Sequence, residues 1–203
     1  MLAGLSRLSG RRFVIIGRAG MDIYPDPPGT RTEHATRFVS CLGGSSANIG
    51  VALVRLGAHA DLVTCVSDDA VGRFALNELD RYGVGRAHVR SVGSEARNSL
   101  AVVETRVEDH QSVIYRNGAA DFEMTPADVE AVDYAGYSAL ITTGTVLAAE
   151  PSRGATETPI CLPPVPMTAS CRRDAEAARC GGRVLAQKSS ISPAPMLDCE
   201  TGR

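Results

Sequence analysis

A glycine pair followed by small polar residues stands out in the stretch CLGGSSANIGVALVRLG, residues 41–57. Gly43 and Gly44 let the backbone approach a ligand closely, and polar residues including Asn48 follow where a helix is expected to begin. Free amides at a helix start can hold an oxygen-rich molecule. No lysine follows the glycines, so a Walker-type phosphate loop is excluded. A ligand clamp and a plain strand-to-helix connection both remain open on spacing alone.

Two charged side chains lie where expected strands end. The Asp22 carboxylate can accept hydrogen bonds from two sugar hydroxyls, and the Arg116 fork, next to Tyr115, suits a carboxylate ligand. A solvated loop aspartate and a surface arginine are the alternative interpretations. The stretch GAAD at 118–121 lacks the second glycine of a catalytic Gly-x-Gly-Asp turn, so we interpret Asp121 as structural.

The elements that would position these residues alternate between strand and helix. Apolar runs predict strands, and helical spacing of apolar residues predicts helices. The first strand and the exit loop that follows it are expected within 11–25. One of the helices is expected to end at Gly57. The remaining predictions are a short strand in 34–44, helices in 45–57, 70–84 and 125–136, strands in 59–69 and 138–146, and a strand pair in 98–118.

This order predicts an α/β fold with a parallel sheet and an inserted β element. Ligands bind such sheets at the carboxyl ends of the strands. The loops expected there are 17–22, 67–72 and 142–146. The fragment GRAGMD at 17–22 does not match the dinucleotide-binding pattern G-x-G-x-x-G.

Composition excludes several classes of function. The chain has 203 residues, of which 44% are hydrophobic, and its net charge is −2. This balance is typical of a globular protein and argues against a nucleic-acid partner. We expect no membrane span, no signal peptide and therefore a cytoplasmic protein. The cysteines form no C-x-x-C pair, so we predict no metal site.

The composition changes near residue 155. All phenylalanine and tyrosine residues lie before position 138, whereas prolines and cysteines concentrate in the last part of the chain. We therefore divide the chain into a domain over 1–153 and an unrelated tail over 154–203. The tail offers little apolar surface to offset the entropy of ordering. It is either a disordered extension or, as we favour, the product of a shifted reading frame.

The ordered set of motifs resembles the PfkB or ribokinase-like carbohydrate kinases. The resemblance rests on Gly43-Gly44-x-x-Ala47-Asn48, on Gly57, and on SDDAVG with its Gly72. It implies a ribokinase-like parallel sheet with helices on both faces and a small β lid over the sugar site, here without its C-terminal half. The lid would comprise the segment 34–41 and the strand pair around 98–117. The resemblance also implies that a homodimer could form through the lid.

The likeness is strongest to members that phosphorylate the sugar acid 5-dehydro-2-deoxy-D-gluconate in myo-inositol breakdown. Asp22 would then hold sugar hydroxyls, and Tyr115 and Arg116 would recognise the acid end. The full set that the resemblance assigns to substrate is Asp22, Gly43, Gly44, Asn48, Tyr115 and Arg116. Another sugar-acid kinase of the family, or a sugar-acid-binding fragment without catalysis, remains the alternative.

The resemblance also implies Mg-ATP as the phosphoryl donor. The family's catalytic base and anion-holding helix start lie on a Gly-Ala-Gly-Asp turn, which this sequence does not contain. We therefore predict no catalytic residue and no ATP site in this chain, and we expect it to be inactive.

Overall fold

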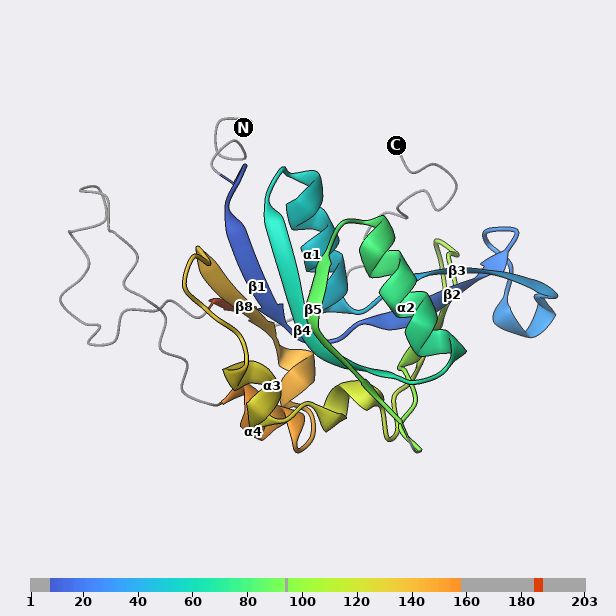
Figure 1. Cartoon of the computed structure of the whole chain (residues 1–203). Helices are drawn as coiled ribbons and strands as arrows, with labels where there is room; N and C mark the ends of the chain where they lie inside the picture. The colour runs from blue at the N-terminus through green and yellow to red at the C-terminus, as the bar shows by residue number, and fades with distance from the viewer. Residues whose placement is uncertain (1–7, 94, 158–184, 188–203) are drawn as a thin grey trace.

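The computed structural model of the chain describes residues 8–93, 95–157 and 185–187. Its central sheet consists of parallel strands in the order β5-β4-β1-β8-β9, as Figure 1 shows for the labelled strands. The α/β class and the parallel sheet predicted from the sequence are confirmed. The strands are β1 (Arg12–Ile16), β4 (His59–Ser67), β5 (Gly85–Val92), β8 (Ala139–Thr143) and β9 (Leu185–Gln187).

The central strand β1 is buried on both sides. Val14, Ile15 and Ile16 have no exposed surface, which fits the β-branched, apolar composition of strands inside parallel sheets. Successive side chains point to opposite faces, so Ile15 belongs to one apolar cluster and Val14 and Ile16 to the other. The sheet therefore has two apolar faces, each of which needs a cover.

Helices supply the cover on both faces, as predicted (Figure 1). The helices α1 (Ser45–Arg55) and α2 (Ala70–Arg81) contribute to the cluster that contains Ile15. The short helices α3 (Pro126–Glu130) and α4 (Ser152–Thr156) contribute to the other. The 3-10 helices are η2 (Thr32–His34), η3 (Ala120–Glu123) and η4 (Gly144–Leu147).

The ends of α1 and α2 follow from local sequence signals. The predicted stop of α1 at Gly57 is confirmed: this residue has φ 83, and its amide donates to the carbonyl of Val54 at 2.9 Å. The amide of Ala58 donates to Leu53 at 3.0 Å, which completes a Schellman motif. At the start of α2, the Asp69 carboxylate accepts the amides of two first-turn residues and serves as N-cap.

A second, smaller sheet has the strand order β3-β2-β6-β7 and extends away from the main one (Figure 1). It confirms the predicted lid. Its strands are β2 (Gly20–Asp26), β3 (Arg37–Gly43), β6 (Leu100–Val103) and β7 (Ser112–Tyr115). We expected 17–25 to be an exit loop, but most of it forms β2. Glycine and proline mark both ends of β2, and they hid its alternating side chains from the sequence interpretation.

Two further elements differ from the prediction. The edge strand β5 was not predicted because its sequence GRAHVRSV carries two exposed arginines and lacks an apolar run. The helix expected over 125–136 begins at Pro126 as predicted but ends at Glu130. Beyond it, the Asp133 carboxylate accepts the amide of Ala135 at 3.0 Å, which favours a turn over further helix.

The boundary predicted at Arg153 falls inside α4. Of the segment 154–203, the structure describes 154–157 and β9, which pairs with β8 in parallel. The rest of the predicted tail lies outside the described residues. Within the described part, no helix is long and apolar enough to cross a membrane.

Replacing Gly72 tests how closely α2 packs onto the end of β4. A Cβ at this position would lie 1.8 Å from the backbone oxygen of Ser67, so Gly72→Ala must displace the helix. We expect a loss of about 1–3 kcal/mol in the free energy of unfolding, measured by urea denaturation. Gly93→Ala, which meets nothing within 4 Å, is the matched control and should leave stability unchanged.

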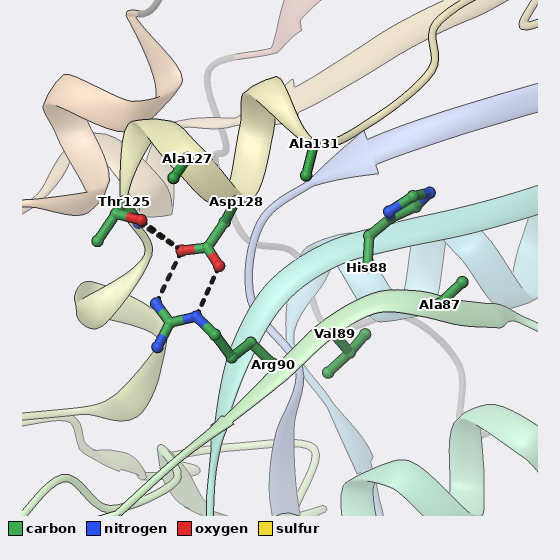
Figure 2. A pocket seen from close by; sticks show the side chains of 8 residues that line it. All are labelled: Ala87, His88, Val89, Arg90, Thr125, Ala127, Asp128 and Ala131. Carbon is green, nitrogen blue, oxygen red and sulfur yellow. Dashed lines mark hydrogen bonds and ion pairs between the residues drawn. The ribbon is translucent and has the colours of Figure 1, made fainter.

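The ion pair between Arg90 and Asp128 predicts a pH dependence of stability. Burial alone would raise the pKa of Asp128, but hydrogen bonds from Arg90 and Thr125 lower it to about 2 (Figure 2). In the unfolded chain the pKa of this carboxyl is about 4. The pair therefore stabilises the fold above that pH, and this stabilisation is lost as the pH falls toward about 2. Asp128→Asn should flatten this part of the stability profile in thermal unfolding. Glu130→Gln, on the exposed side of α3, should keep the wild-type slope.

Candidate functional site

The predicted site residues gather where the carboxyl end of β1 meets the lid. Strand β1 ends at Ile16, and three residues later the chain enters β2, which carries Asp22. The side chain of Asp22 is half-buried, and Cys41 of β3 and Ala101 of β6 are its register partners. Asp22 therefore lies at the junction of the two sheets, where ligands of α/β proteins bind.

The Asp22 carboxylate is packed against the glycine pair. A Cβ on Gly43 would lie 2.1 Å from Oδ1 of Asp22, so only glycine leaves room for the carboxylate. No hydrogen bond between described residues ends on this carboxylate. Burial raises the pKa of Asp22, and the charge of Arg18 partly offsets that rise. The group is an acceptor with unused capacity, which suits neighbouring hydroxyls of a sugar.

Gly44 and Asn48 lie at the start of α1. Gly44 has φ 96, and a Cβ there would come within 2.3 Å of the Arg18 carbonyl oxygen. That same carbonyl accepts the amide of Ala47 at 3.3 Å, so one early amide of α1 is used inside the protein. The Asn48 side chain is exposed and makes no hydrogen bond among the described residues.

Arg116 turns inward immediately after β7. Its Nη2 donates to the Asp121 carboxylate and to the carbonyl of Thr145 at 2.9 Å, and its guanidinium lies over the Phe122 ring, 4.2 Å from the centroid. Asp121 is 3% exposed, which agrees with its interpretation as a structural residue. The pair connects the end of the lid to the carboxyl end of β8.

Tyr115 does not join this group. Its register partner is Leu100, which pairs with Met21, whereas Asp22 belongs to the next row of the sheet. Because successive residues of a strand point to opposite faces, Tyr115 and Asp22 lie on opposite faces of the lid. Tyr115 is 62% exposed there. Its predicted role in recognising the acid end stays a prediction.

Tyr24 is a neighbour of Asp22 that the sequence interpretation did not single out. It lies two residues further along β2 and therefore on the same face of the lid. Burial and the nearby Asp22 carboxylate both raise the pKa of its phenol. The alternation of the strand would have identified it, had β2 been predicted.

A series of side-chain hydroxyls connects the elements next to the site. Ser46 Oγ and Thr143 Oγ1 lie 2.9 Å apart, and Thr143 Oγ1 is also 2.9 Å from Thr145 Oγ1. These contacts connect the start of α1 to the end of β8 and to the carbonyl that Arg116 binds. The predicted loop 142–146 is thus part of the site's framework.

Arg18 is the functional candidate that the sequence interpretation missed. It lies two residues after the end of β1 and is 8% exposed, and its buried Nε has no hydrogen-bond partner among the described residues. Burial lowers the pKa of Arg18, as does the charge of Arg116, while Asp121 and Asp22 act in the opposite direction. The sequence signal that could have identified Arg18 is a single arginine between glycines after an apolar strand.

Together these groups can hold a molecule that is both hydroxylated and anionic. Asp22 offers an acceptor, Arg18 offers buried donors, and Asn48 offers an amide. Among the residues that the structure describes, no group of three or more His, Cys, Asp or Glu side chains could hold a metal ion.

Comparisons with known proteins identify relatives of this chain. The chain is 35% identical over 143 residues to the 5-dehydro-2-deoxygluconokinase of Photobacterium profundum, an alignment that covers 70% of this chain and 43% of that protein. It is 31% identical over 144 residues to the enzyme of the same name from Geobacillus kaustophilus, again covering 70% and 43%. The chain thus spans less than half the length of these relatives.

Solved structures share the fold. The fructokinase of Xylella fastidiosa with bound ATP matches with a TM-score of 0.63 and 22% identity, covering 72% of this chain and 46% of that one. The 2-dehydro-3-deoxygluconokinase of Thermotoga maritima matches with a TM-score of 0.58 and 22% identity, covering 66% and 41%. The sequence model described as pfkB family carbohydrate kinase matches residues 11–160. This chain therefore belongs to the pfkB family of carbohydrate kinases.

Proposed function

We propose that this chain carries the sugar-acid site of an ATP-dependent kinase for 5-dehydro-2-deoxy-D-gluconate, an intermediate of myo-inositol breakdown. The observation that carries the proposal is the unbonded Asp22 carboxylate, packed against Gly43 beside the buried Arg18 and the partly buried Arg116. An acceptor for hydroxyls next to positive charge suits a polyhydroxylated carboxylate. The names of the relatives with 31–35% identity support this substrate.

Each proposed role follows from the chemistry of the group. Asp22 accepts hydrogen bonds from two sugar hydroxyls, and the backbone at Gly43 and Gly44 allows the sugar to come close. Asn48 supplies one donor and one acceptor from the first turn of α1. The acid end of the sugar lies toward the edge that carries Arg18 and Arg116, where positive charge attracts the carboxylate. These contacts bind and orient the substrate, and none of them transfers a proton.

Phosphoryl transfer would need groups that the chain lacks. The family's Gly-Ala-Gly-Asp turn, with its base for the attacking hydroxyl, is absent from the sequence, and the described residues offer no metal-binding cluster. The residues present do not fit Mg-ATP, so we derive no step through it. Our proposal is that this chain binds the sugar acid without phosphorylating it. A sugar acid and ATP are both cytoplasmic metabolites, which supports the cytoplasm as the compartment.

Two alternatives keep the same site but change its use. The sugar could be 2-dehydro-3-deoxygluconate, which differs in the positions of its carbonyl and of its deoxy carbon and would use the same acceptor and cation. A sugar-acid-binding module without any kinase role would also need Asp22 and the two arginines. A panel of sugar acids, compared on this chain by calorimetry, separates the first alternative from the main proposal.

The central experiment measures binding and turnover separately. Isothermal titration calorimetry with 5-dehydro-2-deoxy-D-gluconate should detect binding to the 203-residue chain. Asp22→Asn should weaken that binding by about tenfold or more, because a charged acceptor is replaced by a neutral amide. Asp26→Asn is the matched control on the same strand, since that carboxylate is paired with exposed Arg37.

A coupled assay for ADP gives the second measurement. We expect no ADP formation that depends on the sugar acid. Robust turnover would overturn the proposal that this chain is inactive, and absence of sugar-acid binding would overturn the proposed site.

Exposed apolar side chains on the lid support a homodimer. Phe38 and Val39 on β3, and Val113 and Ile114 on β7, are 41–50% exposed. Burying them against a second lid would remove apolar surface from water. We expect sedimentation equilibrium to give a dimer for the wild type and a monomer for Phe38→Glu combined with Val113→Glu.

The control for the dimer test is Val107→Glu. Val107 is an apolar residue in the turn between β6 and β7, outside the lid strands, and is 97% exposed. This variant should remain dimeric. A monomeric wild type would contradict the proposed lid contact.

A further inference from the structure

The site contains two arginines in opposite electrostatic situations, Arg18, which is buried, and Arg116, which is partly buried. Arg116 is neutralised within the protein: it bonds the Asp121 carboxylate and the Thr145 carbonyl, and it lies over the Phe122 ring. Arg18 is more than nine-tenths buried, yet its side chain takes part in none of the hydrogen bonds or ion pairs formed among the described residues. Arg116 therefore has partners within the protein at Nη2, although its Nε has none, whereas the Arg18 side chain has no such partner at all in the described part of the chain.

A buried arginine without hydrogen-bond partners lowers the stability of a fold. The guanidinium group stays protonated in proteins, so it cannot avoid the cost of burial by losing its charge. A buried charge without a bonded partner is strongly destabilising. The fold gains nothing from this side chain that an apolar residue of the same length would not supply. A ligand that bonds to the guanidinium accounts for its presence.

The position of Arg18 identifies the charge of that ligand. Its main-chain carbonyl is fixed by the amide of Ala47, at the junction of β1, the lid and α1. Arg116 reaches the carboxyl end of β8, the strand that pairs with β1, so both arginines lie at the same edge of the sheet. The two cations repel each other across this edge, and an anion placed at Arg18 removes the repulsion.

We propose that Arg18 binds the carboxylate of the sugar acid and selects acids over neutral sugars, whereas Arg116 is a positioning residue that holds Asp121. The inference rests on the proposed sugar-acid site and adds to it the group that recognises the acid. Asp22 then binds hydroxyls and Arg18 binds the carboxylate. These two side chains of opposite charge therefore determine the orientation of the substrate in the site.

The test compares an acid with a neutral sugar alcohol of the same skeleton. D-Gluconate and D-glucitol differ in a carboxylate and a hydroxymethyl group, and both are titrated calorimetrically into the 203-residue chain, alongside 5-dehydro-2-deoxy-D-gluconate. Arg18→Met should weaken binding of both acids by about ten- to a hundredfold and leave D-glucitol within about twofold, because a charged hydrogen bond is lost. Arg18→Lys, which keeps the charge without the fork, should lie in between.

Thermal unfolding without ligand provides an independent measurement. Arg18→Met removes an unpaired buried charge, so its melting temperature should equal or exceed that of the wild type. Arg116→Met is the matched control: it leaves the buried Asp121 carboxylate without its partner, and its melting temperature should fall. Opposite effects of the same substitution distinguish a ligand-binding arginine from a structural one.

The outcomes separate this inference from the proposed function. If the wild type binds 5-dehydro-2-deoxy-D-gluconate and Arg18→Met keeps the preference for acids, the role of Arg18 is wrong and the proposed site stands. The role is also wrong if Arg18→Met lowers the melting temperature as much as Arg116→Met. If the wild type binds none of the three compounds, the proposed site fails and this inference fails with it.

Discussion

Close approach of backbone to side chains at the carboxyl end of β1 is the constraint on which the site depends. A Cβ on Gly17 would lie 1.8 Å from Ser46 Oγ, one on Gly43 would meet the Asp22 carboxylate, and one on Gly44 would meet the Arg18 carbonyl. These glycines allow β1, the lid and the start of α1 to converge at one point. A larger residue at any of them would separate the lid from the sheet and move Asp22 away from the arginines.

The charges at this point are arranged within an apolar surrounding. Next to this point lie the strands β1 and β4, whose side chains Val14, Ile15, Ile16, Leu62 and Val63 have no exposed surface. Charges therefore interact strongly with one another at this edge, where the local dielectric constant is low. The Arg116–Asp121 pair satisfies one cation and links the lid to β8. The remaining cation, Arg18, and the remaining anion, Asp22, stay unbonded and available to a ligand.

Much of this arrangement was predictable from the sequence, because local signals agreed with the tertiary fold. Helical spacing and Gly57 gave the extent of α1, and the lid hairpin and β8 were predicted from apolar runs. Two strands were not predicted. One is β2, whose ends carry glycine and proline, and the other is β5, whose exposed arginines suit the edge of a sheet. Neither carries a continuous apolar run, and their strand conformation comes from pairing with neighbours.

The candidate site was predictable only in part, for a related reason. Gly43 and Gly44 could be predicted as a pair because they lie where β3 ends and α1 begins, whereas Asp22, expected at the end of the first strand, lies inside β2. The pairing of Tyr115 with Arg116 ignored the period of two along a strand, which sends neighbours to opposite faces. The burial of Arg18 could not be read from the sequence, because it depends on how β1, the lid and the start of α1 meet in the folded chain.

Binding and phosphoryl transfer place different demands on such a chain. Binding requires an acceptor, a cation and a rigid support, and here these come from β1, the lid and β8, which are connected by hydrogen bonds within the described residues. Transfer requires in addition a base at the attacking hydroxyl and donors for the moving phosphoryl group. The first set is held together by contacts that do not involve the second. The proposed recognition of substrate therefore does not depend on the groups that transfer needs, and the two properties should be measured separately.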